Sequence, residues 1–489
     1  MLALSSCTTP STTSNTTPPA PSAPAAPREV TFFFSAEVRG YLGPCGCSEN
    51  MRGSISRAAF QVAEARKAGG AVHFVDCGDG LFGEAEIPPV AQPQQERKAK
   101  ALSDAWKAMG LDVRAPGPLD DARGAEFHQS LALPELASGT FKVIDRVALV
   151  SAPSIKDAAA LVPEARKAGG RFIVALVPTN YGQALREVID PPTGIDLVIS
   201  SKSKDAFAAE ESKLAGGTTR VAQIQSKGRS LLKLTVTFEG DDAVTWLKGD
   251  ADRDREVAAL DQRIELLRVQ VNEPMLNDEL KALRKTKLEE VISRREALAS
   301  SPVEMPKGKS VAQARFIPLE TTFPKDPKVL ALEQAYDADV GLMNLAYAKE
   351  KGVSCAKATP TVPGIVGTAT CVTCHAEAES VYVKTKHPLA WKALEAVGKQ
   401  NHLDCIGCHV TGWQKPDGVC RLDVIAGRQD VGCESCHGPG SLHVAAPSKV
   451  KLPKLVEAKT CIGCHDRENS PTFDFDTYVE KVKGPGHGR

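Results

Sequence analysis

Four copies of the pattern Cys-x-x-Cys-His lie in the last quarter of this 489-residue chain, at residues 371–375, 405–409, 433–437 and 461–465. Two thiols at this spacing can bond to the two vinyl groups of one haem, and the next imidazole then becomes the proximal ligand of its iron. Zinc sites and redox dithiols also use Cys-x-x-Cys, but neither needs a histidine directly after the second cysteine four times over. The pattern therefore predicts four c-type haems in a domain whose core is largely porphyrin.

The motifs determine which side chains are expected to hold the haems. The predicted residues are Cys371, Cys374, Cys405, Cys408, Cys433, Cys436, Cys461 and Cys464 for the thioether bonds, and His375, His409, His437 and His465 for the proximal iron ligands.

Further histidines are candidates for the opposite side of each iron. A second imidazole closes the sixth position and restricts that haem to electron transfer, whereas an open position can bind a small ligand. We rank the distal candidates His443, His387 and His402. His402 comes just before the second motif, where a surface loop is the simpler interpretation. His487 lies in a Gly-rich tail and is not expected to be a ligand.

Composition excludes several classes of function. Lys plus Arg equals Asp plus Glu at 60 each, so no basic field points to nucleic acid. No apolar run reaches the roughly 18 residues that a membrane-spanning helix needs. The length allows two or three domains, and redox proteins are the expected partners of the haem segment.

The first 27 residues predict a location at a membrane surface. Leu4-Ser-Ser-Cys7 resembles the lipobox of bacterial lipoproteins, in which the cysteine is acylated, and a tether rich in Thr, Ser, Pro and Ala follows it. Only Met1-Leu-Ala3 precedes this segment, so either the natural start lies upstream or Cys7 is an ordinary residue. Because c-type haem attachment also implies export, we expect a lipid-anchored protein of the periplasm or cell envelope.

Five cysteines are assigned neither to haem nor to lipid. Cys355 and Cys420, which enclose the first two haem motifs in sequence, are expected to form a disulfide in the haem domain. The sequence leaves open any pairing among Cys45, Cys47 and Cys77.

Residues 28–248 alternate apolar strands with helices, which predicts a layered α/β domain. The last strand, ending before Glu239-Gly240, is expected at a sheet edge. The expected strands are 30–34, 71–75, 141–150, 172–177, 195–200 and 230–238, and the expected helices are 58–68, 158–168 and 183–188.

The next segment changes period. Apolar residues from Val257 to Val271 recur every three or four positions, and a second, less regular stripe runs from Leu276 to Leu298. This pattern predicts an antiparallel helical hairpin, and a coiled coil that dimerises the protein is the alternative.

A Pro- and Lys-bearing linker is expected at 302–327 and one amphipathic helix at 329–350. The chain is therefore expected to be multidomain, with an α/β layered sandwich, an α-helical hairpin and a mainly α multihaem domain. The expected division is 1–27 for the lipobox-like start and tether, 28–248 for the α/β domain, 249–350 for the hairpin and linker, and 351–489 for the haem domain.

The haem segment resembles the cytochrome c554 family. The resemblance is carried by the four motifs, by Thr385-Lys-His387 and by the block Gly432-Cys-Glu-Ser-Cys-His-Gly-Pro-Gly440. It implies a mostly helical tetrahaem domain that shuttles electrons, with some irons bound by two histidines and one iron open. Carried over, His443 and His387 match distal ligands, whereas a second family histidine near His387 is replaced by Leu389 or missing.

Residues 30–240 resemble the calcineurin-like phosphoesterases of the 5'-nucleotidase type. The matching stretches are Phe34–Cys47, Val75–Asp79 and Gly194–Ile199. These enzymes hold two metals through the motifs Asp-x-His, Gly-Asp, Gly-Asn-His and two later histidine motifs, and the metals activate a water.

Almost none of these metal ligands is present. Gly78-Asp79 survives, but Glu37-Val-Arg39 replaces Asp-x-His, Gly117-Pro-Leu119 replaces Gly-Asn-His, and Lys202 and Lys204 occupy the last histidine positions. An ammonium group cannot ligate a metal unless it is deprotonated. The resemblance therefore implies a phosphoesterase-like fold with no divalent metal and no hydrolysis. A cleft lined by Arg39 and the two lysines could bind an anion, but solvated loop residues are the simpler interpretation.

The sequence as a whole predicts a periplasmic multihaem electron carrier whose inactive phosphoesterase-like domain serves as a scaffold or docking module. A rival hypothesis is a haem enzyme that acts on a small nitrogen or oxygen species at one open iron. Two further hypotheses are residual phosphoesterase activity and a pure binding module.

Overall fold

A computed structural model describes residues 28–44, 51–189, 193–201, 212–239, 242–247, 250–273, 276–301, 306–425, 427–466, 469–470 and 473–484, with only the backbone described at 250–252 and 254–255. Several predicted features lie outside these ranges, namely Cys7 and its tether, Cys45, Cys47, Lys202, Lys204 and His487. None of the helices within the described ranges is both long and apolar enough to cross a membrane.

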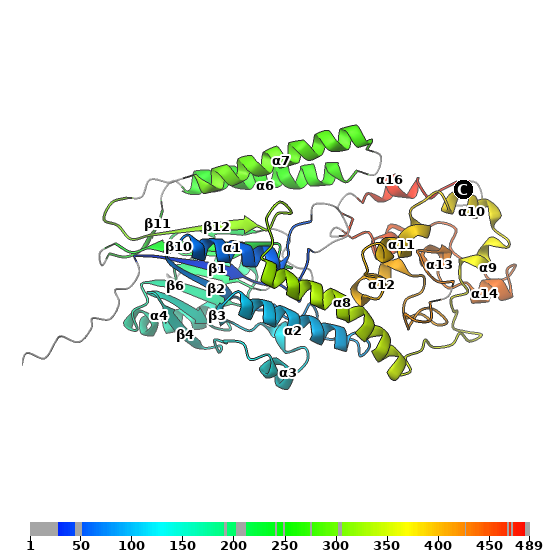
Figure 1. The fold of residues 1–489 in the computed structure, drawn as a ribbon, viewed down its shortest axis with the longest axis horizontal. Helices are drawn as coiled ribbons and strands as arrows, with labels where there is room; N and C mark the ends of the chain where they lie inside the picture. Colours follow the sequence, from blue (N-terminus) through cyan, green and yellow to red (C-terminus); the bar gives the residue numbers. More distant parts are fainter. Residues whose placement is uncertain are drawn as a thin grey trace, which may run out of the picture.

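Two six-stranded mixed sheets form the N-terminal part of the molecule (Figure 1). The first has the order β11-β12-β10-β1-β2-β3 and the second the order β4-β5-β6-β7-β9-β8. The strands are β1 (Glu29–Ser35), β2 (Ala71–Asp76), β3 (Leu111–Arg114), β4 (Thr140–Ile144), β5 (Val147–Ser151), β6 (Phe172–Val177), β7 (Leu197–Ser200), β8 (Lys213–Gly216), β9 (Arg220–Gln223), β10 (Ser230–Thr237), β11 (Thr245–Trp246) and β12 (Val311–Pro318).

The sheets pack face to face, and helices cover both outer faces. Alternate residues of β1, such as Phe32 and Phe34, join the core between the sheets, while Phe33 packs under the helices of the first sheet. Strands buried on both faces read as continuous apolar runs, which explains Val-Thr-Phe-Phe-Phe in β1. The covering helices are α1 (Ile55–Lys67), α2 (Gln92–Ala108) and α8 (Pro327–Glu350) on the first sheet and α4 (Ile155–Lys167) and α5 (Tyr181–Glu187) on the second, with the short helices η1 (Pro118–Asp121) and α3 (Ala125–Ser130) after β3.

The predicted layered α/β sandwich is confirmed, and three details of the sequence prediction are wrong. Strand β10 is central, because it pairs with both β1 and β12. The expected linker 302–327 contains β12, whose alternating small and polar residues fit a pleated strand. The expected strand 141–150 is a hairpin, β4–β5, whose turn residues Asp145 and Arg146 have positive φ.

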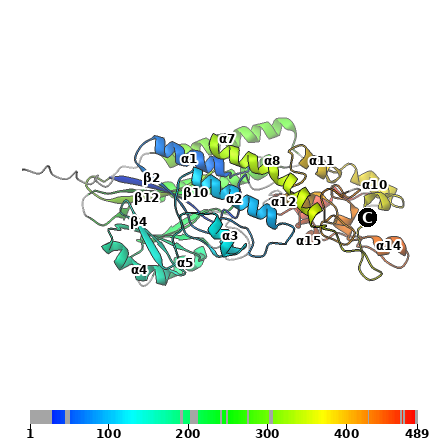
Figure 2. The same cartoon turned by 60° about the horizontal axis from the view of Figure 1, so that its bottom comes forward.

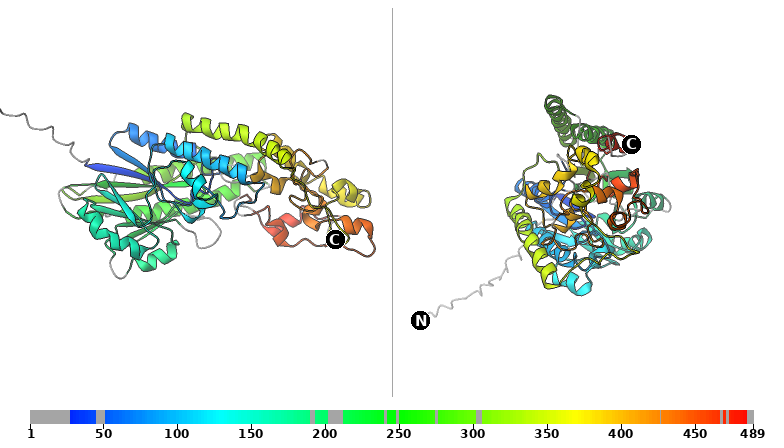
Figure 3. Two further views of the ribbon diagram at one scale, coloured as in Figure 1. Left: turned by 90° about the horizontal axis from the view of Figure 1, so that it is seen from below. Right: turned by 90° about the vertical axis from the view of Figure 1, so that its right-hand side faces the viewer.

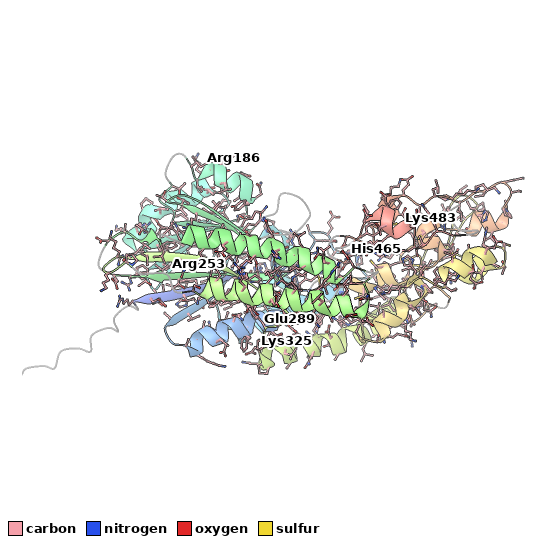
Figure 4. The ribbon with its side chains drawn as sticks, turned by 90° about the horizontal axis from the view of Figure 1, so that it is seen from above. Arg186, Arg253, Glu289, Lys325, His465 and Lys483 are labelled. Atoms are coloured by element: carbon pink, nitrogen blue, oxygen red, sulfur yellow. A yellow bond between two sulfur atoms is a disulfide. The ribbon has the colours of Figure 1, made fainter. Side chains whose placement is uncertain are left out.

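The predicted helical hairpin is confirmed as α6 (Asp250–Val271) and α7 (Asp278–Ser300). Its apolar stripes form a core of their own, which includes Ile264 and Val271. Figure 4 looks down on the pair, with Arg253 near the start of α6 and Glu289 on α7. Where the hairpin meets the first sheet, buried charges replace apolar contacts. Glu320, after β12, pairs with Arg52 and with Arg268 of α6.

The C-terminal part is built from short helices joined by loops (Figure 3). A small apolar core includes Ile406 and Val419, and the predicted disulfide Cys355–Cys420 is present. The helices are α9 (Thr368–Val372), α10 (Ala376–Tyr382), η2 (His387–Leu389), α11 (Ala390–Glu395), α12 (Leu403–His409), α13 (Cys433–His437), α14 (Ser441–Ala445), α15 (Ala458–Cys461) and α16 (Phe475–Val479).

Candidate functional site

Each Cys-x-x-Cys-His motif lies in or beside a short helix, α9, α12, α13 or α15. Helical turns bring the first cysteine close to the histidine: the amide of His375 donates to the carbonyl of Cys371 at 3.1 Å, and that of His465 to Cys461 at 2.8 Å. Residues three and four positions apart share one face of a helix. Both thiols and the imidazole of a motif can therefore address one flat group.

Two motif histidines face histidines from elsewhere in the chain. The ring centres of His375 and His443 lie 6.3 Å apart with an interplanar angle of 30°. Those of His465 and His387 lie 6.2 Å apart at 59°. Since each metal–nitrogen bond is about 2 Å long, two imidazoles that bind one metal from opposite sides have ring centres roughly 6 Å apart. Both pairs therefore have room for one metal ion between the rings.

Backbone carbonyls select the tautomer of three of these rings. The Nδ1 atoms of His409, His437 and His443 lie 2.6, 2.8 and 2.7 Å from the carbonyl oxygens of Ala390, Pro453 and Val450. A carbonyl can only accept, so Nδ1 carries the proton and donates. In His409 and His443, Nε2 then carries an electron pair and no proton, which is the arrangement that metal-binding histidines use.

Thiol contacts show which motifs are neighbours. A hydrogen bond between thiols of the first and third motifs raises the pKa of Cys371 and lowers that of Cys433 to about 7. The same contact between the second and fourth motifs raises the pKa of Cys408 and lowers that of Cys464. Burial, with Cys461 nearby, raises the pKa of Cys436 to about 11. The motifs thus adjoin in the order first, third, fourth, second.

Glu434, inside the third motif, joins that motif to the first. Its buried carboxylate accepts the amides of Val366 and Gly367, just before α9, at 2.7–3.1 Å. It also accepts the amide of Gly440 at 2.7 Å. This one side chain accounts for the glutamate of the Cys-Glu-Ser-Cys-His-Gly-Pro-Gly block, and it accepts the amide of the residue that closes the block.

His402, the third distal candidate, lies in a different setting. Its side chain is buried against α8, where its ring packs edge-on against Tyr336 with centres 6.1 Å apart. Its Nε2 atom lies 3.4 Å from the carbonyl oxygen of Asp337. The expectation of a surface loop residue is therefore wrong, because α8 covers this part of the haem segment.

In the N-terminal part, the carboxyl ends of β2 and β3 carry a buried cluster of charges. Asp76 and Arg114 are fully buried, with Arg114 Nε 3.3 Å from the Asp76 carboxylate. Arg114 also lies 2.5 Å from Asp120 and 3.0 Å from Glu135. Burial raises the pKa of Asp76 to about 7, although the Coulombic effect of Arg114 opposes that rise.

The remaining carboxylates near this point also have partners. Asp120 accepts four backbone amides, from Asp79, Gly80, Leu81 and Gly117, at 2.7–3.0 Å. Asp79 accepts the amide of Leu119 at 2.8 Å. A Cβ at Gly117 would lie 2.3 Å from Asp79 Oδ1, so only glycine permits this approach.

These residues do not fit a dinuclear metal centre. In the described part of the chain no three His, Cys, Asp or Glu side chains are grouped so that they could hold a metal ion. The guanidinium of Arg114 lies against Asp76 and Asp120, and that of Arg39 lies 3.0 Å from Glu37. The cations therefore neutralise Asp76, Asp120 and Glu37, and Asp79 already accepts the amide of Leu119. Arg114 was not predicted from the sequence. The one sequence feature that could have indicated it is an arginine at the end of a buried strand.

Comparison with known proteins agrees with the resemblance predicted for the haem segment. Residues 370–438 match the family of cytochrome c554 and c-prime. Cytochrome c-554 of Nitrosomonas europaea is 27% identical over 170 residues, which cover 24% of this chain and 72% of that protein.

Similar solved structures include the NAD nucleotidase of Haemophilus influenzae, with a TM-score of 0.42 over 73% of this chain and 69% of that one. A 5'-nucleotidase precursor of Thermus thermophilus has a TM-score of 0.39 over 76% and 68%. Each is 14% identical in sequence. The chain therefore contains, in its C-terminal part, a segment similar to cytochrome c554 and c-prime.

Proposed function

We propose that this chain carries electrons between redox partner proteins through four covalently bound haems. When bound, c-type haem supplies reversible one-electron exchange at its iron. The observation that carries the proposal is the pairing of His375 with His443 and of His465 with His387, since two rings at these separations leave no open position on a shared metal.

Each group in the proposed ligand set has one role. The eight motif cysteines hold the haems covalently, and the four motif histidines are the proximal ligands. His443 is the distal partner of His375, and His387 is the distal partner of His465. We leave His402 out, because its ring is buried against Tyr336 and Asp337.

The order of the motifs supports transfer through the whole domain. Hydrogen-bonded thiols join the first motif to the third and the second to the fourth, and Cys461 of the fourth motif is near enough to help raise the pKa of Cys436 in the third. Haems attached at these thiols would be neighbours in the same order. The first and second motifs are the two ends of this order, so an electron accepted at one of them could leave at the other.

We propose that the α/β region has no hydrolytic activity and serves as a scaffold. The support is the Arg114 cluster, which leaves Asp76 and Asp120 without vacant ligand positions. The similarity to cytochrome c-554 and the requirements of c-type haem attachment support a location in the periplasm or cell envelope. The lipobox-like Cys7 supports a lipid anchor.

One observation favours a second candidate function, chemistry on a small nitrogen or oxygen species at an open iron. Among the described residues, no second histidine ring packs against His409 of the second motif. The Nδ1 of His409 is already used by Ala390, so its Nε2 is directed to a single metal ligand position. A haem held there could keep its opposite face open.

Visible spectra of the mature protein, oxidised and dithionite-reduced, with and without carbon monoxide, test both functions. Sharp low-spin bands that carbon monoxide leaves unchanged support an electron carrier with four saturated irons. A response from about one haem in four supports the open-iron candidate. His443→Ala should add about one more responsive haem in four, and an unchanged response would contradict its assignment as a ligand.

A further inference from the structure

We infer that the α/β region positions the second haem motif, because its helices α2 and α8 contact the first turn of helix α12 and the loop before it. The inference rests on the proposed function, because it assigns residues outside the cytochrome domain to one of its four haems. Helix α8 runs from the sheets to the C-terminal part and brings α2 close to α12 (Figures 1 and 2).

Gln94 of α2 is the central contact. Its side chain is fully buried, and its Oε1 accepts the backbone amide of Leu403, the first residue of α12, at 3.0 Å. The first amides of a helix have no partner within the helix, so a side chain from another element supplies the cap here. Gln94 therefore holds the end of the helix that carries Cys405, Cys408 and His409.

A second buried amide holds Gln94 and the preceding loop together. Asn344 of α8 donates to Gln94 Oε1 at 2.6 Å and to the carbonyl oxygen of Asn401 at 2.9 Å. A Cβ at Gly341 would lie 3.2 Å from the Asn401 side chain, so α8 approaches this loop closely. Two helices thus contact neighbouring residues of one segment, α8 at Asn401 and His402 and α2 at Leu403.

An ion pair and an apolar contact complete the junction. Lys98, one turn after Gln94 on α2, lies 2.7 Å from the carboxylate of Asp404. Leu345 of α8 packs into the apolar core that contains Ile406 and Cys405. The contacts with residues 401–404 thus include polar groups with fixed partners, which set orientation as well as attraction.

This arrangement predicts a specific effect on one haem. If the contacts are removed, water reaches the start of α12, and water stabilises the more highly charged oxidised iron. Because solvent access and nearby hydrogen bonds set haem potentials, the potential of the second-motif haem should fall while the other three hold. A module that only docks partners would leave all four potentials unchanged.

The test is a spectroelectrochemical titration of the full haem-loaded chain with the double variant Gln94→Met and Lys98→Met. Methionine has a similar length but cannot accept the amide of Leu403 or pair with Asp404. The matched control is Glu96→Gln on the same helix, which breaks the 2.8 Å pair with Arg123 away from α12. Lys98→Arg keeps the cation and leaves the Gln94 acceptor in place, so it should keep the potential of the unmodified chain.

The expected result is four haems per chain in every variant, with one redox component at lower potential in the double variant alone. Four unchanged components in a folded double variant would overturn the inference, as would a shift of all four together. If the double variant does not fold, Lys98→Met alone is titrated, and the same outcomes apply. Fewer than four haems in the unmodified chain would contradict the proposed function and not the positioning role.

Discussion

Arg114→Met should destabilise the α/β region strongly. The guanidinium is fully buried and is within 3.3 Å of Asp76 and 2.5 Å of Asp120, both also fully buried. Removing one partner of a buried ion pair leaves an uncompensated charge and costs about 3–5 kcal/mol. The half-exposed pair of Arg123 and Glu96 gives the control, because Arg123→Met should cost only about 0–1 kcal/mol.

The stability lost in Arg114→Met should also depend on pH, because Arg114 changes the pKa of Asp76. Burial raises the pKa of Asp76 from 3.8 to about 7, so its contribution to stability is full below pH 3.8 and is lost as the pH rises through about 7. Arg114 opposes this rise, so its removal should raise the pKa of Asp76 further. The variant then keeps a proton on Asp76 that the unmodified protein releases, and the stability difference should grow above pH 7.

Urea unfolding followed by far-ultraviolet circular dichroism, at pH 6 and pH 8.5, measures both effects. The Soret band serves as a separate reporter of the haem region and should change little before the α/β region unfolds. Adding Asp76→Asn to Arg114→Met should recover part of the stability, because it removes the uncompensated charge. A loss below about 1 kcal/mol at both pH values would refute a buried, charge-balanced cluster. Metal-dependent phosphoesterase activity in the unmodified chain would refute the assignment of an inactive site.

Three further outcomes are expected. Burial alone would lower the pKa of His73, but hydrogen bonds to Asp112 and Asp145 raise it above 6.5. The stability that His73 contributes is therefore full below pH 6.5 and is lost as the pH rises through the pKa of the folded state. His73→Gln should remove this pH dependence from the free energy of unfolding measured in urea. Cys420→Ser opens a disulfide whose cysteines are 65 positions apart, which should cost about 4 kcal/mol, measured as a lower Tm of the haem region. Glu320→Gln leaves two buried guanidiniums without their shared carboxylate at the base of the hairpin and should cost about 3 kcal/mol, measured by urea unfolding, with faster proteolysis of α6 and α7.

Local pattern was sufficient for the parts of the fold that depend on neighbouring residues. The apolar runs of β1 and β6 predicted buried strands, and the stripes of the hairpin predicted its two helices. Helix α2 was missed because its first turns are almost wholly polar, and Gln94 and Lys98 are buried by contacts with elements distant in sequence, which include α8, α12 and Tyr41. Burial of polar residues by a distant element leaves no period in the sequence.

Non-local pairing set the limit for the rest. Strand β12 follows the hairpin yet pairs with β10, so the order of the chain hid its place in the first sheet. The haem motifs were visible because their chemistry requires adjacent residues, whereas the partner of each motif histidine is not adjacent. His387 follows the first motif but faces His465 of the fourth, and only the fold brings these two rings together.

The charge cluster around Arg114 and the junction with α12 both bear on the role of the α/β region. A metal site needs carboxylates and imidazoles that remain available to an incoming ion, whereas Asp76 and Asp120 are held by Arg114. A site whose carboxylates are balanced by an arginine needs no ion to balance them, which supports the proposal that the region is a scaffold. On its surface Gln94 and Asn344 use amide groups to hold the second haem motif. The motif that this junction contacts is the one whose histidine, His409, donates its Nδ1 proton to the carbonyl of Ala390 and so presents Nε2 as an electron-pair donor.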